Sequence, residues 1–142
     1  MEKELENILS DISSRDRFIG VLDYGEERTS KETLIYEKSK AVYIEAVDCI
    51  WSMHQGECPM SDTLDPRYVL KNHLRETKNS DGSYYLLLDN PPRTGFFNEM
   101  ATYALMHVTD GRLKSMRIIH ATIDMAGKPV KIKQTEKIDF FY

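Results

Sequence analysis

The sequence contains no run of about 18 consecutive apolar residues, so no segment is expected to cross a membrane as a helix. Its opening stretch, MEKELENILSDI, is charged from the start and lacks the apolar core of a secretory signal, so no signal peptide is expected. Only two cysteines are present, Cys49 and Cys58, which are too few for a disulfide framework and favour a reduced, intracellular setting. These absences predict a cytoplasmic protein with no membrane partner.

Several motifs that mark common enzyme classes are also absent. The chain lacks the phosphate-binding loops GxGxxG and GxxxxGKS/T, the nucleophile elbow GxSxG and the zinc-binding HExxH. Its 19 basic residues are scattered and outnumbered by 23 acidic ones, and the net charge of -4 argues against a nucleic-acid partner. Cys49, His54 and Cys58 carry side chains that suit zinc, but no fourth ligand is evident nearby, so neither a metal nor a cofactor is expected.

What is present is the composition of a folded protein. Hydrophobic residues make up 41% of the chain and charged residues 30%, values typical of globular proteins. A chain of 142 residues is long enough for one core and too short for two. No repeat or linker divides it, so a single domain over residues 1–142 is predicted.

The first half of the chain predicts helices. Apolar residues at every third or fourth position over 5–12 form one helical stripe, which Ser13 and Ser14 can end. A second short helix is expected over 18–22, with a stop at Gly25. Residues 38–54 favour a third helix, although their β-branched and aromatic content leaves strand open for part of 34–54. Connecting segments are expected over 26–33 and 55–66, and a further helix over 66–77.

The second half predicts antiparallel strands over 84–89, 96–108, 112–124 and 130–142, so the fold class is α+β. Asp110 and Gly111 between two such runs indicate a two-residue type I′ hairpin turn.

The hairpin bears on two histidines in matching His-x-Thr motifs, HVT from His107 and HAT from His120. With a regular register they share one face of the sheet but lie roughly 20 Å apart. The motif pair resembles that of the 2H phosphoesterases, in which the two histidines face each other across one site. Neighbouring strands of one hairpin cannot bring them together, so this alternative stays open only if the hairpin does not form.

The same regular register gathers ionisable side chains on a largely apolar face. Glu99, Tyr103 and His120 are expected there, together with the apolar residues Leu105, Met116 and Ile118. Burial of ionisable groups is unfavourable unless they are paired or used, so a histidine near a glutamate could act as a general base. The alternatives are a hydrogen-bonded Glu–His pair at the rim of the core, or exposure at the end of the sheet.

Two stretches, LENILSDISSRDRFIGVL and ATYALMHVTDGRLKSMRIIHATID, resemble the NTF2-like superfamily. The first is similar to its broken pair of N-terminal helices and the second to its long final hairpin. This superfamily of ketosteroid isomerases, scytalone dehydratase and SnoaL-like cyclases has N-terminal helices packed on a curved, mainly antiparallel sheet. The resemblance implies a cavity lined by the inner sheet face, including Glu99, Tyr103 and His120, with Tyr24 or Trp51 on the helix side.

The sequence therefore predicts a domain that binds a small, partly apolar molecule. Any chemistry would be proton transfer of the isomerase, dehydratase or cyclase type, with His120 or Glu99 as the base and Tyr103 as a hydrogen-bond donor. The alternative is a non-catalytic interaction module. In either case a homodimer formed through the outer sheet face is expected, because many members of the superfamily pair in that way.

Overall fold

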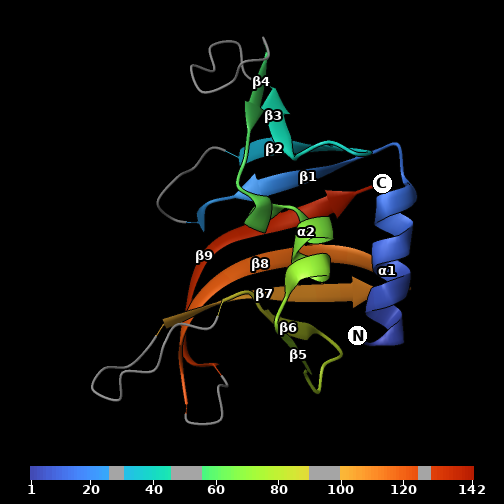
Figure 1. Cartoon of the computed structure of the whole chain (residues 1–142). Coiled ribbons are helices and arrows are strands. Elements are labelled where there is room, and N and C mark those ends of the chain that lie inside the picture. Colours follow the sequence, from blue (N-terminus) through green and yellow to red (C-terminus); the bar gives the residue numbers. More distant parts are fainter. Residues whose placement is uncertain (26–30, 46–55, 90–99, 125–128) are drawn as a thin grey trace.

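The computed structural model of the chain describes residues 1–25, 31–45, 56–89, 100–124 and 129–142. Within these ranges two α-helices pack on one curved antiparallel sheet of nine strands (Figure 1). The helices are α1 (Lys3–Ser14) and α2 (Pro66–Asn72), with a short 3-10 helix, η2 (Asp62–Leu64), before α2. The strands are β1 (Arg17–Asp23), β2 (Lys31–Glu37), β3 (Tyr43–Glu45), β4 (Glu57–Pro59), β5 (Arg75–Lys78), β6 (Tyr84–Leu87), β7 (Met100–Thr109), β8 (Arg112–Ile123) and β9 (Pro129–Phe141). The predicted α+β class is confirmed.

The strand order is β4-β3-β2-β1-β9-β8-β7-β6-β5, so the sheet consists of two meanders side by side. Strands β1 to β4 form one and β5 to β9 the other, and the first meets the second where β1 pairs with β9. The sheet is not closed, because β4 and β5 remain at its two edges. No helix in the described part of the chain is long and apolar enough to cross a membrane.

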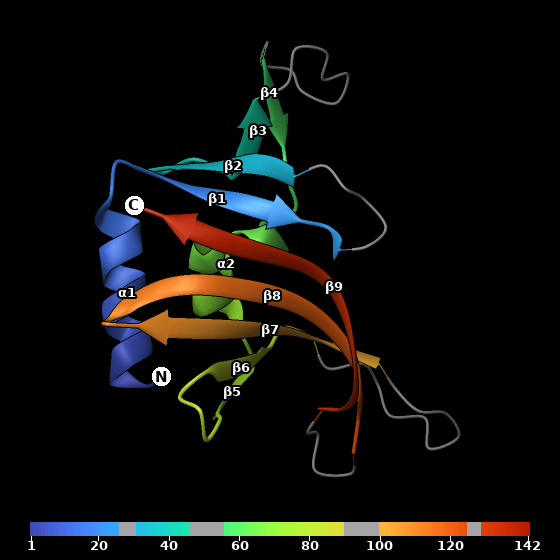
Figure 2. The same ribbon diagram turned by 180° about the vertical axis from the view of Figure 1, so that it is seen from behind.

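Both helices cover the same face of the sheet, and the main core lies between them and the strands (Figure 1). Helix α1 buries Leu5, Ile8 and Ile12, the stripe predicted from its spacing, and α2 buries Val69 and Leu70. In the described residues the opposite face carries no helix (Figure 2). The sheet's larger contributions to the core are Phe18, Leu22, Leu34, Tyr36, Tyr84, Leu86, Met106, Met116, Ile138 and Phe140.

Several predicted elements are wrong. Residues 18–22 lie in β1 rather than in a second helix, and burial alternates along that strand as it does in a sheet covered on one face. Within the helix expected over 38–54, Tyr43–Glu45 forms β3, and residues 46–55 lie outside the described residues. The connection expected over 26–33 already contains the start of β2, and that over 55–66 contains β4 and η2. The helix expected over 66–77 ends at Asn72.

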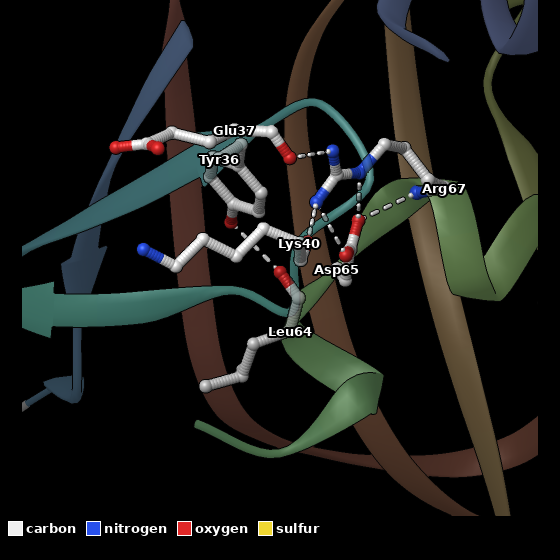
Figure 3. Close-up of polar contacts among 6 residues, drawn as sticks. All are labelled: Tyr36, Glu37, Lys40, Leu64, Asp65 and Arg67. Atoms are coloured by element: carbon white, nitrogen blue, oxygen red, sulfur yellow. Dashed lines mark hydrogen bonds and ion pairs between the residues drawn. The ribbon is translucent and has the colours of Figure 1, made fainter. Parts of the chain in front are cut away.

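Strand β1 packs closely against its neighbours around Gly20. A Cβ atom at Gly20 would lie 2.7 Å from Cγ2 of Ile138 and 3.1 Å from Cε2 of Tyr36. The Tyr36 ring stacks on Phe18 with 4.5 Å between ring centroids, and its hydroxyl donates to the Leu64 carbonyl at 2.7 Å (Figure 3). Burial raises the pKa of Tyr36, so this hydroxyl keeps its proton. Glycine is therefore required at position 20 by the lack of space above the strand.

A buried ion pair fixes α2 to the turn between β2 and β3 (Figure 3). Asp65 caps α2 by accepting from the Arg67 backbone N–H at 3.0 Å, and its carboxylate also accepts from Nε and Nη2 of Arg67 at 3.0 and 2.9 Å. The same guanidinium donates to the carbonyls of Glu37 and Lys40 at 2.8 and 2.9 Å. Arg67 is only 8% exposed, so one buried side chain joins the helix cap to both ends of the turn.

Candidate functional site

The hairpin of β7 and β8 forms as predicted but carries a bulge. Asp110 and Gly111 have φ of 52° and 74°, as a type I′ turn requires, and Thr109 pairs with Arg112. The register then shifts by one residue between His107 and Val108. Because side chains alternate between faces, a shift of one residue moves every later side chain of β8 to the other face.

This shift separates residues that the sequence placed together. His120 lies opposite Thr102 and faces the helices, whereas Tyr103 lies opposite Ile119 on the face that carries no helix in the described residues. His107 is four residues after Tyr103 on β7 and shares its face, so the two histidines are on opposite sides of the sheet. The expectation that His107, Tyr103 and His120 share one face is wrong. The hairpin forms, so the condition that kept the two-histidine phosphoesterase open is not met.

The other expected site residues are dispersed as well. Glu99 and Trp51 lie outside the described residues. Leu105 packs beside Tyr103 on that second face, and Tyr24 is partly buried with its hydroxyl donating to Glu32 at 2.9 Å.

Tyr103 itself belongs to an apolar cluster. It is 2% exposed, and its ring contacts Tyr85 edge-on at 5.9 Å between centroids. Met116 is part of the main core. Ile118, another of the apolar residues predicted to line the site, lines a pocket together with His120.

A hollow lies between the sheet and α2 beside His120, and of the predicted site residues it contains only His120 and Ile118. It has a volume of about 280 Å³ and lies where α2 and η2 approach β7, β8 and β9. Its walls therefore combine a helix, the end of β6 and three central strands. The lining residues are Thr63, Tyr68, Asn72, Leu88, Asp89, Thr102, Ile118, His120 and Glu136.

Thr102 positions two ionisable groups in this pocket. Its hydroxyl and Nδ1 of His120 lie 3.1 Å apart and share a hydrogen bond. Its backbone N–H donates to a carboxylate oxygen of Asp89 at 2.7 Å. In the described part of the chain Nε2 of His120 has no hydrogen-bond partner. The ring is therefore oriented through one nitrogen, and the other is available to a ligand.

Glu136 is the acidic partner that sequence reasoning missed. A second register shift, between Ile118 and Ile119, places Glu136 opposite Ile118 and on the same face as His120. The two side chains are diagonal neighbours across β8 and β9. Partial burial raises the pKa of Glu136, although the nearby His120 acts to lower it. The sequence gives no clear signal for it, because Glu136 stands among the polar and charged residues KQTEK and nothing nearby specifies the register.

The described residues offer no metal site. No group of three or more histidine, cysteine, aspartate or glutamate side chains in the described ranges is arranged to hold a metal ion. Cys58 lies in β4 and is disulfide-bonded, so its sulfur is not available as a zinc ligand. The expectation of reduced cysteines is therefore wrong for Cys58.

No family model, no curated protein and no solved structure matches the chain.

Proposed function

We propose that the pocket beside His120 binds a small molecule and catalyses proton transfer within it. The observation that carries this proposal is that His120 and Glu136 line the same hollow of about 280 Å³ from adjacent strands. Ligand pockets usually run from about 300 Å³ upward, so this one suits a compact molecule. Its polar lining favours a ligand with oxygen atoms over a hydrocarbon.

The hydrogen bond between Thr102 and Nδ1 suits His120 to act as the base. When Nδ1 carries the proton, it donates to the Thr102 hydroxyl and leaves a lone pair on Nε2. Nε2 can then take a proton from a carbon or oxygen atom of the ligand. Thr102 thus acts as a positioning residue that orients the ring, and the tautomer with the proton on Nδ1 is the one that can act as the base.

Glu136 suits the complementary role. Because burial raises its pKa, its carboxyl group holds a proton at a higher pH than an exposed glutamate does. It can donate that proton to an oxygen on which negative charge develops as His120 takes the first proton. Return of a proton from His120 to a different carbon atom of the ligand, and of the proton on oxygen to Glu136, completes an isomerisation.

The test is deuterium exchange into small enolisable carbonyl compounds, which report proton abstraction without knowledge of the natural substrate. Purified protein in D₂O is expected to speed exchange of the acidic C–H of the compounds it binds. His120→Asn is expected to lower that rate by about 100-fold or more, as loss of a general base does. Glu136→Gln is expected to lower it as well.

His107→Asn is the matched control, because His107 lies on the opposite face of the same hairpin. It is expected to exchange at the rate of the unchanged protein. Equal rates in His120→Asn and His107→Asn would overturn the proposed function.

Membership of the NTF2-like superfamily stays a prediction. The β7–β8 hairpin supports it, and β1, in place of a second N-terminal helix, counts against it. A cytoplasmic location also stays a prediction, and the disulfide of Cys58 counts against it, because disulfides persist mainly in oxidising compartments.

The second candidate function is a dimeric interaction module, with a second copy on the sheet face that carries no helix in the described residues. Tyr85, Leu105 and Ile123 favour it, because they are only partly buried apolar side chains on that face. They pack around the cluster that contains Tyr103, which is itself buried within one chain. Leu105→Glu should convert a dimer into a monomer in size-exclusion chromatography with light scattering, and a monomeric unchanged protein would rule this candidate out.

A further inference from the structure

A second hollow, of about 360 Å³, adjoins α2. Tyr68 and Asn72 line both this hollow and the one beside His120, so one stripe of α2 borders the two. The walls of the second hollow are the last turn of α1, the turn between β2 and β3, η2 and α2. It contains none of the groups assigned to proton transfer.

Positive charge gathers around this hollow. Lys38 and Lys40 reach it from the β2–β3 turn, and Lys71 reaches it from α2. Lys40 pairs with Glu57 at 2.6 Å, whereas Lys38 and Lys71 have no ion pair among the residues that the structure describes. Like charges around one hollow repel each other, and a bound anion removes that repulsion.

The acidic residues of the hollow only partly offset these charges. The Asp65 carboxylate is held by the Arg67 guanidinium in a buried ion pair with two hydrogen bonds. Asp62 is exposed to solvent, where its charge is screened. Among the described residues, two ammonium groups without an ion pair therefore line the hollow against one such carboxylate.

The turn that carries two of the lysines is held rigid. Arg67 donates to the carbonyls of Glu37 and Lys40, on either side of Lys38 and Ser39. A binding surface fixed in advance loses less conformational entropy when a ligand arrives.

Ser13 supplies an unsatisfied polar atom. Ser13 is one of the residues that line the hollow. Its Oγ atom is buried and has no hydrogen-bond partner in the described part of the chain. A buried hydroxyl without a partner is unfavourable, and a ligand oxygen would satisfy it. This is independent of the lysine charges and points to the same kind of ligand.

We propose that this hollow binds the phosphate group of a small molecule, held by Lys38, Lys71 and the Ser13 hydroxyl. A phosphate dianion matches two ammonium groups in charge, and its several oxygen acceptors can accept from the ammonium groups and the hydroxyl together. The chain lacks glycine-rich phosphate loops, so recognition here comes from side chains.

The experiment is a titration of the intact chain with inorganic phosphate, at constant ionic strength, followed by amide chemical shifts. Saturable shifts are expected around residues 38–40 and 71. The double variant Lys38→Gln/Lys71→Gln is expected to bind about tenfold more weakly or worse, because charge-assisted hydrogen bonds are lost. Ser13→Ala is expected to weaken binding by a smaller factor.

Three comparisons keep the result specific. Lys3→Gln/Lys114→Gln makes the same change in net charge at exposed positions elsewhere and should bind phosphate normally. His120→Asn should also bind normally, so failure here is distinguishable from failure of the proposed function. Equal weakening in the two lysine doubles, absence of saturable shifts, or equal binding of acetate would overturn the phosphate assignment.

Discussion

Arg67 serves more partners than any single side chain around α2. Its guanidinium neutralises the buried Asp65 carboxylate and satisfies the carbonyls of Glu37 and Lys40. Removing it leaves a buried charge and two carbonyls without their donor, which costs far more than losing a surface pair.

Arg67→Leu is therefore expected to lower the free energy of unfolding by about 3–5 kcal/mol, the usual cost of breaking one side of a buried ion pair. Urea denaturation measures it directly. Lys71→Leu, on the exposed side of the same helix, is expected to change stability by about 0.5 kcal/mol or less. Similar losses in both variants would mean that the buried pair does not hold α2 in place.

The raised pKa of Glu136 makes the stability of the folded protein depend on pH. Its raised pKa means that the folded protein binds this proton more tightly than the unfolded chain does. The stabilisation is fully present below the ordinary glutamate pKa of about 4.3 and is lost as the pH rises through the folded-state pKa.

Glu136→Gln removes that dependence, so its stability relative to the unchanged protein is expected to rise as the pH increases through this range. Denaturation midpoints measured over a pH series test the sign. Glu45→Gln, at an exposed position, serves as the comparison and is expected to keep the original dependence. A constant difference between Glu136→Gln and the unchanged protein at all pH values would contradict the assigned burial.

The strand register, which determines the residues that share a face of the sheet, was only partly predictable from the sequence. The type I′ turn is set by two adjacent residues, Asp110 and Gly111, and was predictable from them. The bulge three residues later has no local signature, because Lys114 resembles any exposed strand residue. It follows instead from the fit of Met116 and Ile118 into the helix-covered core. His120 could therefore be proposed as a site residue, but its partners could not.

The assignment of β1 failed for a similar reason. Phe18 and Leu22 are four residues apart, a spacing that one face of a helix and one face of a strand both allow. Pairing with β9, more than 100 residues later in the chain, favours the strand. By contrast, α1 and the start of α2 were predictable because their stripe and cap lie within one short segment.

Gly20→Ala tests the close packing of β1. The added Cβ would lie 2.7 Å from Cγ2 of Ile138, so the variant is expected to lose about 1–3 kcal/mol of stability through overpacking. Ile138→Ala removes the clashing methyl group and is expected to cost less in the Gly20→Ala background than alone. A double-mutant cycle by urea denaturation measures this coupling, and additive effects would show that the strand moves away instead.

In the sheet as a whole, the first strand, β1, and the last strand, β9, lie side by side in the interior of the strand order. Strands β1 and β9 each have a partner on both sides, whereas β4 and β5 have one. Edge strands open more easily than central ones.

Amide hydrogen exchange is expected to follow this order, with slow exchange in β1, β8 and β9 and faster exchange in β4 and β5. The measurement is native-state exchange followed residue by residue. Exchange in β1 as fast as in β4 would indicate that the two meanders open independently along the β1–β9 pairing.

The pairing of β1 with β9 also determines when the sheet can be completed during synthesis on the ribosome. While the chain is being synthesised, residues 17–23 emerge long before residues 137–141, so β1 remains without its central neighbour until β9 has left the exit tunnel. Until β9 is available, the early segment exposes one unpaired strand edge, which invites contacts with other nascent chains. Slow, late completion is the expected behaviour of a sheet whose central contact joins such distant segments. A helper that covers that edge during synthesis would therefore raise the yield of folded protein more than one that acts after release.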